Sequence, residues 1–527
     1  MANFISVVRE RTQYFNRRLF LSVGLIALSS LNYGFDNQAF STTESMTAFQ
    51  KTFGVYNAKT HTYSLPSVWL SLFNSLNYIT FGIGVLFGSF ISNRFGRRWC
   101  MFSMSCYALV SATVCVTSQN KSQIMAARIL NYFYIGMELS VVPMFQSEIV
   151  PAPIRGLAVA TYQLSITLGG LVINGTCFAT NNSYSDNRSW RVPLGLFYII
   201  PTIIISGIWF VPESPRWLLQ KNRNDEARHN LGLLRQGATR YPSEGVIDQE
   251  FEELQKQLER ESEKGAFLEI FRGRTNLKRT LVVAVINFFQ QASGQGFISQ
   301  YGAVYVKSLN TFNSTLFSLM NSGISVAVII AVLITSDKIG RRTSLYVSGI
   351  VMIAALYTMG GVGTQPTPLS TASKRGIMSM MTIYGVGFAI GWGPLTYVVA
   401  TEIPALRLRE HTLRFGFLIN VIFNFAVNFA IPYLISADYA NLGSKVGFIF
   451  GSIMVMSMFF VYFCVPECKD KSLEQIDYLF HNGTRLRDFG KIAPASVALE
   501  VVFEKAVPNG DVEAVTVQLK SSSNGKP

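Results

Sequence analysis

The residues best placed to do chemistry are charged side chains inside long apolar runs. The run that begins at Arg128 carries this arginine near its start, Glu138 in its middle and a charged exit that ends at Arg155. An ionisable group in the hydrocarbon of a bilayer costs several kcal/mol unless it faces a partner or water. Arg128 and Glu138 are therefore candidates for proton or substrate chemistry.

Other kinds of chemistry find little support in the sequence. The four His residues are scattered, and the chain has no phosphate-binding loop and no nucleophile arrangement, so we predict that it is not an enzyme. The six Cys residues lack metal-ligand spacing, so we expect neither a metal nor another cofactor. The net charge of +14 resides in short loops between apolar runs, which argues for membrane topology and against nucleic acid as a partner.

Composition places the elements that must hold these groups in a membrane. Of the 527 residues 49% are hydrophobic and 14% are charged, and the mean hydropathy is +0.29. A soluble protein would carry about a quarter charged residues. Apolar runs long enough to span a bilayer predict twelve transmembrane helices, at 19–40, 67–91, 99–117, 123–145, 157–179, 192–211, 279–303, 315–335, 344–361, 376–400, 412–434 and 444–465.

Basic loops predict the orientation of these helices. Positive clusters at 93–98, 337–342 and 407–414 fall on the same side as the amino-terminal arginines, so both termini should be cytoplasmic. The plasma membrane is the expected location. The loops on the opposite side carry four Asn-x-Ser/Thr triplets that permit glycosylation, at Asn120, Asn181, Asn187 and Asn313.

The two halves of the chain repeat one another. Gly-Arg-Arg at 96–98 recurs at 340–342, an offset of 340 − 96 = 244 residues, and Pro212-Glu213 recurs as Pro466-Glu467. The predicted fold is an all-α polytopic membrane protein with two six-helix bundles, an architecture known for secondary transporters. The expected parts are a cytoplasmic amino-terminal segment (1–18), the first bundle (19–211), a cytoplasmic linker with short amphipathic helices (212–278), the second bundle (279–465) and a cytoplasmic tail (466–527). We expect the tail to be disordered after Asp477.

Several motifs in a fixed order give the chain a resemblance to a known family. The chain resembles the sugar-porter family of the major facilitator superfamily over about 19–480. The motifs are GSFISNRFGRR (88–98), RILNYFYIG (128–136), PMFQSEIVPAPIRG (143–156), PESPRWLL (212–219), QQASGQG (290–296), SDKIGRR (336–342), GWGPLTY (391–397) and PECKDKSLEQID (466–477). TEIPALRLREHT (401–412) looks like fungal members of the family.

The resemblance implies a proton site in the amino-terminal half. Asp36 matches a first-helix aspartate that accepts the proton in proton-coupled members, and Arg128 matches the arginine that tunes it. Burial favours the protonated form of a carboxyl group and a nearby guanidinium favours the ionised form, so a moving Arg128 could switch Asp36. We therefore expect Arg128 to pair with Asp36.

Glu138 is not part of the common family pattern. It follows Arg128 by 138 − 128 = 10 residues, which puts it about 80° around the helix from the arginine. Three roles stay open for it at this point: a second proton site, a substrate ligand, or a neutral acid that bonds to a neighbouring helix.

The sugar site follows from the resemblance position by position. Amides offer two donors and an acceptor to paired hydroxyls, and aromatic rings cover the apolar faces of a sugar. The implied contacts are Gln163, Gln290, Gln291, Gly296, Tyr301, Ser325, Trp392, Tyr397, Asn420 and Asn424. The chain departs from the hexose pattern at Gly170, Gly296, Gln300, Ser325 and Tyr397, which leaves room for a disaccharide, a polyol or a sugar-like metabolite.

Charged motifs at the cytoplasmic helix ends imply a gate. In the family these arginines and acids lock the cytoplasmic side when the site opens outward. The implied gate residues are Asn93, Arg97, Arg98, Glu148, Arg155, Glu213, Arg216, Asp337, Arg341, Arg342, Glu402, Arg407 and Glu467. Asn93 stands where the family has Asp, so the amino-terminal lock should lack one charge-assisted bond and open more easily.

These patterns predict a proton-coupled importer of a hexose or disaccharide that works by alternating access. Its partners are then a sugar or sugar-like molecule, a proton and the lipid bilayer. Efflux of a secondary metabolite is the alternative, motivated by the departures at 296, 300, 325 and 397. A nutrient receptor that binds sugar without transporting it is a third hypothesis, which a tail of only about 50 residues after Asp477 disfavours.

Overall fold

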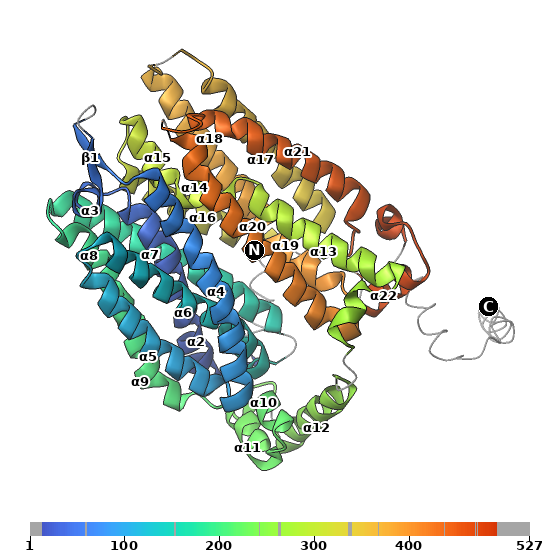
Figure 1. The fold of residues 1–527 in the computed structure, drawn as a ribbon. Coiled ribbons are helices and arrows are strands. Elements are labelled where there is room, and N and C mark those ends of the chain that lie inside the picture. The colour runs from blue at the N-terminus through green and yellow to red at the C-terminus, as the bar shows by residue number, and fades with distance from the viewer. Residues whose placement is uncertain are drawn as a thin grey trace.

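The computed structural model describes residues 13–492 apart from 58–60, 152–153, 242, 262–264, 336–339, 367, 437, 470 and 472. Helices stand at all twelve predicted spans, and the two halves of the chain form two groups of helices side by side (Figure 1). Ten long helical segments in the described part are apolar enough to cross a membrane. The other two predicted spans are the 29-residue helices α6 and α7.

The amino-terminal bundle is built on one hydrophobic core. Its helices and short 3-10 segments are α2 (Arg17–Thr43), α3 (Thr47–Phe53), α4 (Ser67–Phe95), α5 (Arg97–Val116), α6 (Lys121–Ile149), α7 (Arg155–Ser183), α8 (Arg188–Gly195), η2 (Leu196–Tyr198), α9 (Ile199–Gly207) and η3 (Ile208–Phe210). Asn16 caps α2, because its Oδ1 accepts a hydrogen bond from the Leu19 N–H at 2.6 Å. A small hairpin pairs β1 (Val55–Asn57) with β2 (Thr62–Ser64).

The carboxy-terminal bundle has a second core and two interrupted spans. Its helices are α13 (Arg274–Ala292), α14 (Gln295–Gln300), α15 (Gly302–Leu309), α16 (Ser314–Thr335), α17 (Arg341–Val362), α18 (Thr371–Ile390), α19 (Trp392–Glu402), η5 (Leu406–Leu408), α20 (Arg409–Ile435), η6 (Gly443–Lys445) and α21 (Val446–Cys464). Gly294 separates α13 from α14 with φ +93°, a conformation that suits glycine. Gly391 separates α18 from α19.

Between the bundles, residues 212–278 hold short helices below the membrane region. They are α10 (Pro215–Gln220), α11 (Asn224–Arg235), α12 (Glu244–Glu261) and η4 (Phe267–Phe271). Arg235 connects this segment to the amino-terminal bundle, because it donates a hydrogen bond to the Ile149 carbonyl at 2.8 Å. It also forms an ion pair with Glu250 inside the segment. At its other end, Arg407 of the carboxy-terminal bundle forms an ion pair with Glu269.

The prediction of disorder after Asp477 was wrong for the first part of the tail. Helix α22 (Leu473–His481) and the 3-10 segment η7 (Leu486–Lys491) pack on the carboxy-terminal core, where Phe480 and Phe489 are buried. Asp477 accepts an ion pair from the buried Arg279 of α13. A short apolar segment thus packs on the core of the carboxy-terminal bundle. A search for long apolar runs does not detect so short a segment. Residues 493–527 lie outside the described part.

Hydrogen bonds between the two bundles gather at the end of the molecule that carries the hairpin of β1 and β2. Within the described residues they join Asn37 to Gln300, Ser45 to Ser314, Gln50 and Thr47 to Lys307, Ser71 to the Phe429 carbonyl, Asn174 to Ser322 and Asn182 to Asn313. These residues belong to the outer halves of their helices or to outer loops. The bundles are therefore bonded to each other at this end, which the basic loops predict to be the outside.

Candidate functional site

Arg128 has a different acidic partner from the one that we expected. Its Nη1 lies 3.1 Å from Glu44 Oε1, its Nη2 donates to Asn74 Oδ1, and Asn74 Nδ2 donates to Glu44 Oε2 at 3.1 Å. All three side chains are at most 1% exposed. The expected ion pair between Arg128 and Asp36 is corrected to one with Glu44, because Glu44 lies beyond the predicted first span and α2 continues far enough to bring it opposite Arg128.

Asp36 is buried on α2 and makes a neutral contact. Its Oδ1 accepts a hydrogen bond from Asn131 Nδ2 at 2.7 Å, and the residue is 1% exposed. Asn131 stands one helical turn after Arg128, so both lie on the same side of α6. This spacing was a usable signal for Asn131, which the sequence analysis missed.

Glu138 is fully buried in the same bundle. It is 0% exposed, and neither carboxyl oxygen has a hydrogen-bond partner among the described residues. Asp36 is close enough to interact with it electrostatically, as are Tyr33, Tyr134 and Tyr162. It is surrounded by hydroxyl-bearing rings and by another acid.

A ladder of amides connects the two long helices α13 and α20. Asn420 Nδ2 donates to Gln290 Oε1 at 2.8 Å and to Asn287 Oδ1 at 3.2 Å, and Gln291 Nε2 donates to Asn420 Oδ1 at 3.0 Å. Gln290 Nε2 continues to the Gly393 carbonyl at 3.0 Å. Three predicted sugar contacts, Gln290, Gln291 and Asn420, therefore share one network, which Asn287 completes.

The other predicted sugar contacts surround this ladder unevenly. Asn424 accepts from Asn428 Nδ2, and the Tyr301 hydroxyl donates to the Asn428 carbonyl at 2.6 Å. A Cβ at Gly296 would come within 2.7 Å of Asn428 Oδ1, so Asn428 fills the space beside that glycine. Trp392 is fully buried, Ser325 is half-buried, and Gln163 and Tyr397 are exposed, with Tyr397 stacked on Phe417.

The amino-terminal gate residues form one cluster. Arg97 makes a bidentate pair with Glu148, with both N–O distances 2.8 Å, and both side chains are at most 5% exposed. Glu213 accepts hydrogen bonds from the backbone N–H groups of Arg97 at 3.0 Å and Arg98 at 3.1 Å, so its carboxylate caps the start of α5. Burial raises the pKa of Glu213 and these hydrogen bonds lower it, with a net rise.

The carboxy-terminal gate repeats the helix-capping part of this cluster and has a looser ion pair, in which Arg341 Nε and Nη2 donate to the same oxygen of Glu402 at 3.3 and 3.0 Å. Arg341 pairs with Glu402 at 3.0 Å, and Glu467 accepts hydrogen bonds from the Arg341 and Arg342 N–H groups, each at 3.0 Å. Gly96 and Gly340 precede the two helices, and a Cβ at either would come within 2.5 Å of the capping glutamate. Each cluster lies within its own bundle.

The remaining gate residues differ in what they contact. The Asn93 side chain is exposed and its carbonyl accepts from Trp217 Nε1 at 3.1 Å. Arg98 lies over the Trp209 ring and Arg342 donates to the Tyr462 carbonyl at 2.6 Å. Arg407 joins the linker through Glu269, as described above. Arg216 lies beside Trp217 at the start of α10, and Asp337 and the Arg155 side chain are outside the described residues.

The glycosylation candidates lie at or near helix ends, with Asn181 in the last turn of α7. Asn120, Asn187 and Asn313 are exposed and Asn181 is half-buried. Asn187 Oδ1 also accepts hydrogen bonds from Thr52 and Trp190, and Asn313 Oδ1 caps the start of α16 through Thr315.

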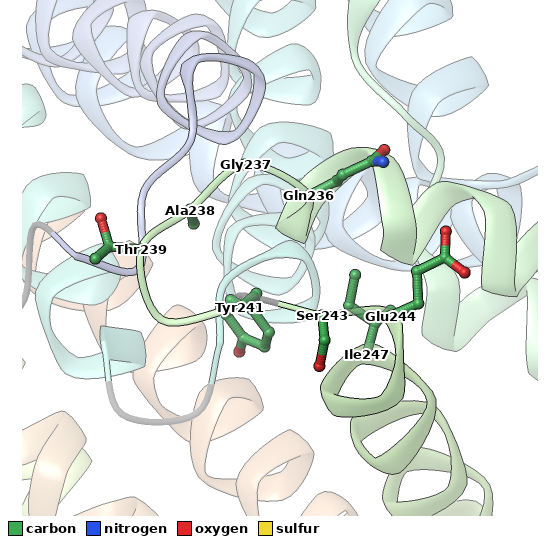
Figure 2. Close-up of a pocket in the computed structure, with 8 residues that line it drawn as sticks. All are labelled: Gln236, Gly237, Ala238, Thr239, Tyr241, Ser243, Glu244 and Ile247. Atoms are coloured by element: carbon green, nitrogen blue, oxygen red, sulfur yellow. The ribbon is translucent and has the colours of Figure 1, made fainter.

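A surface pocket is present in the cytoplasmic linker. It lies beside the loop that joins α11 to α12 and is lined by Gln236, Gly237, Ala238, Thr239, Tyr241, Ser243, Glu244 and Ile247 (Figure 2). None of the predicted sugar contacts lies there. The amide ladder, located between the long membrane helices, is the better candidate for substrate binding.

The fold and this set of sites define a membrane transporter with the major facilitator architecture: two six-helix bundles, corresponding ionic clusters at equivalent helix ends, and polar groups inside. The sequence pattern of the family described as "Sugar (and other) transporter" matches residues 23–480. The chain therefore belongs to this family of sugar porters, as its motifs predicted.

Some of its relatives are named for the substrate that they transport, and others are not. The chain is 26% identical over 520 residues to the MFS transporter fmqE of Aspergillus fumigatus, covering 95% of each chain. It is 29% identical to the low-affinity glucose transporter HXT3 of Saccharomyces cerevisiae, covering 87% of this chain and 81% of that protein. Its fold is similar to the inward-open xylose transporter XylE of E. coli, with TM-score 0.71, 21% identity and coverage of 88% and 99%.

Proposed function

We propose that this protein imports a hexose or disaccharide together with a proton, by alternating access between its two bundles. The observation that carries the proposal is the separation of two chemistries. Buried acids and Arg128 lie in the amino-terminal bundle, and the amide ladder lies in the carboxy-terminal bundle. A proton and a sugar can then bind on opposite sides of the same bundle interface.

The amide ladder supports a neutral, hydroxyl-rich substrate. Each amide presents a donor and an acceptor, the pairing that adjacent sugar hydroxyls require. The exposed Tyr397 and the buried Trp392 flank the ladder on α19 and supply rings for the apolar sugar face. Two of the relatives are a glucose transporter and a xylose transporter by name, which is consistent with this class.

Asp36 is the proposed proton acceptor. Its only hydrogen bond among the described residues is to a neutral amide, and it is buried from water. A carboxyl group in such a place is costly when ionised without a partner, so gain and loss of a proton would follow the conformation. We assign Arg128 to the same coupling site and Glu138 to a second proton-binding position.

The cytoplasmic clusters around Arg97 and Arg341 serve as the gate in this proposal. In the inward-facing arrangement each cluster holds the helices of one bundle together. On closure of the cytoplasmic side, the same charged ends would meet across the interface. We further propose that the protein resides in the plasma membrane with cytoplasmic termini, which leaves the four Asn-x-Ser/Thr sites outside.

The test is uptake of labelled mono- and disaccharides by transport-deficient cells, with and without a protonophore. The wild type should accumulate its sugar against a gradient and lose this ability with the protonophore. Asp36→Asn should abolish accumulation and leave exchange of labelled for unlabelled sugar intact. Accumulation by Asp36→Asn would disprove the mechanism, and absence of any sugar uptake would favour a receptor.

Efflux of a sugar-like metabolite is the second candidate function. Two features of the predicted sugar site favour it: Asn428 fills the space beside Gly296, and the Tyr397 ring stacks on Phe417. Both differ from the common hexose pattern. Net export from preloaded cells, with no uphill uptake, would establish this function instead.

A further inference from the structure

Glu44 is the buried acid to which the transport cycle above assigns no role. It closes a triangle of hydrogen bonds with Arg128 and Asn74 in which each residue contacts the other two. The Phe40 ring lies 4.7 Å from the guanidinium carbon of Arg128 and covers one side of the pair. A fully desolvated ion pair of this kind is expensive to break, so it holds Arg128 firmly in this conformation.

The same residue is connected to the closed extracellular side. The Glu44 carbonyl accepts a hydrogen bond from Gln50 Nε2 at 3.0 Å, and Gln50 Oε1 accepts one from Lys307 Nζ at 2.7 Å. Lys307 belongs to α15 of the opposite bundle. Tyr301, also from the opposite bundle, is close enough to interact electrostatically with both Glu44 and Arg128. Closure of the outside therefore keeps water away from the pair.

Asp36 is bound to the same side of α6 that carries Arg128. Asn131, which holds Asp36, is one turn along α6 from Arg128, about 4.5 Å along the helix axis. The Tyr132 ring lies 5.7 Å from the guanidinium and interacts electrostatically with Arg128, Asp36 and Glu44 alike. Arg128 is thus bound to Glu44, and the side chain that binds Asp36 lies one turn away on the same helix.

We propose that Glu44 is a positioning residue that holds Arg128 away from Asp36 while the extracellular side is closed, so that proton binding at Asp36 depends on the state of that side. This inference rests on the proposed proton coupling. When the outside opens, Gln50 separates from Lys307, water reaches the pair, and Arg128 becomes free to approach Asp36. Glu44 thereby connects the extracellular contact with the proton site.

Several charged or titratable groups surround these two acids. They come from the helices packed against α2 and from α2 itself: Cys115 of α5, Arg128, Tyr132, Tyr134 and Glu138 of α6, Tyr301 next to α15, and Tyr33. Arg128 is the only cation in this set. In this proposal the position of Arg128 therefore decides which of the two acids has a cationic partner.

The test is an infrared titration of the purified full-length protein in liposomes, without substrate. The carbonyl band of a protonated buried carboxyl group is followed against pH and assigned to Asp36 by its loss in Asp36→Asn. In Glu44→Gln the guanidinium is released, and the midpoint of the Asp36 band should move by about one to three pH units toward acid. Glu44→Asp keeps the charge, so its midpoint should fall between those of the wild type and Glu44→Gln. Asp186→Asn, which alters an exposed outer-loop acid paired with Arg188, is the matched control and should leave the midpoint unchanged.

The outcomes separate this inference from the proposed function. If no band depends on Asp36, the proposed proton acceptor is wrong and the inference falls with it. If the Asp36 band titrates but Glu44→Gln leaves its midpoint unmoved, Glu44 is a structural partner of Arg128 and the inference alone is wrong. Should Glu44→Gln fail to assemble, an unmoved midpoint in Glu44→Asp has the same meaning.

Discussion

The two bundles share their cytoplasmic ends and differ in their interiors. Arg97, Glu148 and Glu213 are matched by Arg341, Glu402 and Glu467. The capping hydrogen bonds to the first arginine N–H are 3.0 Å in both halves, and the ion pairs are 2.8 Å and 3.0 Å. Inside the membrane the amino-terminal bundle buries Asp36, Glu44, Arg128 and Glu138. Among the described residues of the carboxy-terminal bundle, the buried charged side chain is Arg279, near the cytoplasmic start of α13. The charged clusters at the helix ends thus correspond, and the interiors differ, with charge in one half and amides in the other.

The first prediction concerns the depth of the two gate ion pairs. Glu148→Gln leaves Arg97 buried without an anionic partner, which should cost about 3–5 kcal/mol of unfolding free energy. Glu402→Gln should cost about 1 kcal/mol or less, because Arg341 is 23% exposed and water solvates it. Denaturant unfolding of the two purified variants in detergent measures both. Equal losses of unfolding free energy in the two variants would show that the difference in burial between the two ion pairs does not affect their contribution to stability.

The second prediction concerns the amide ladder. Asn420→Ala leaves Gln290 and Gln291 without a shared partner and removes a proposed sugar contact, at a cost of about 1–3 kcal/mol. The KM for the transported sugar should rise about tenfold or more, and the pH dependence of uptake should stay as in the wild type. Asn32→Ala, a buried amide of the other bundle, is the control and should change KM less than about twofold. A changed pH dependence in Asn420→Ala would contradict the division between the bundles.

The third prediction concerns the two capping glutamates. Glu213→Ala and Glu467→Ala each remove a carboxylate that accepts from two N–H groups at the start of a helix. Each should cost about 0.5–2 kcal/mol, with values equal to within about 0.5 kcal/mol. Thermal unfolding of the two proteins in the same detergent compares them directly. A large difference between the two losses of stability would mean that the surroundings of the two glutamates differ, although their hydrogen bonds correspond.

Much of this comparison could be predicted from the sequence. The twelve spans follow from hydropathy, and the gate residues follow from motifs that recur at matching places. The partner of Arg128 could not be predicted, because Glu44 lies four residues beyond the predicted end of the first span and only the length of α2 brings it opposite the arginine. Asn287 and Asn428 were missed for a similar reason, since a buried amide in an apolar helix gives no signal until its neighbours are known.

The last prediction uses the lysine that joins the bundles on the outside. Lys307, beyond the membrane-spanning part of its helix, has its pKa lowered by burial from 10.5 to about 8. In an outward-open state the amine would be solvated and keep its ordinary pKa, so its charged form disfavours closure. The ratio of closed to open protein should therefore rise as the pH rises from about 8 to about 10.5, by at most about tenfold per pH unit. Below pH 8 the amine is charged in both states, so titration of Lys307 should not change this ratio.

Distances between spin labels across the outer ends of α3 and α16 report this ratio. Lys307→Met removes the titrating amine, so its distance distribution should be flat from pH 8 to 10.5. A wild-type distribution that is equally flat would mean that the amine stays solvated in the closed state and that the contact with Gln50 contributes little. A rise that persists in Lys307→Met would assign the pH dependence to another outer group, and the charge difference between the bundles would then extend beyond their interiors.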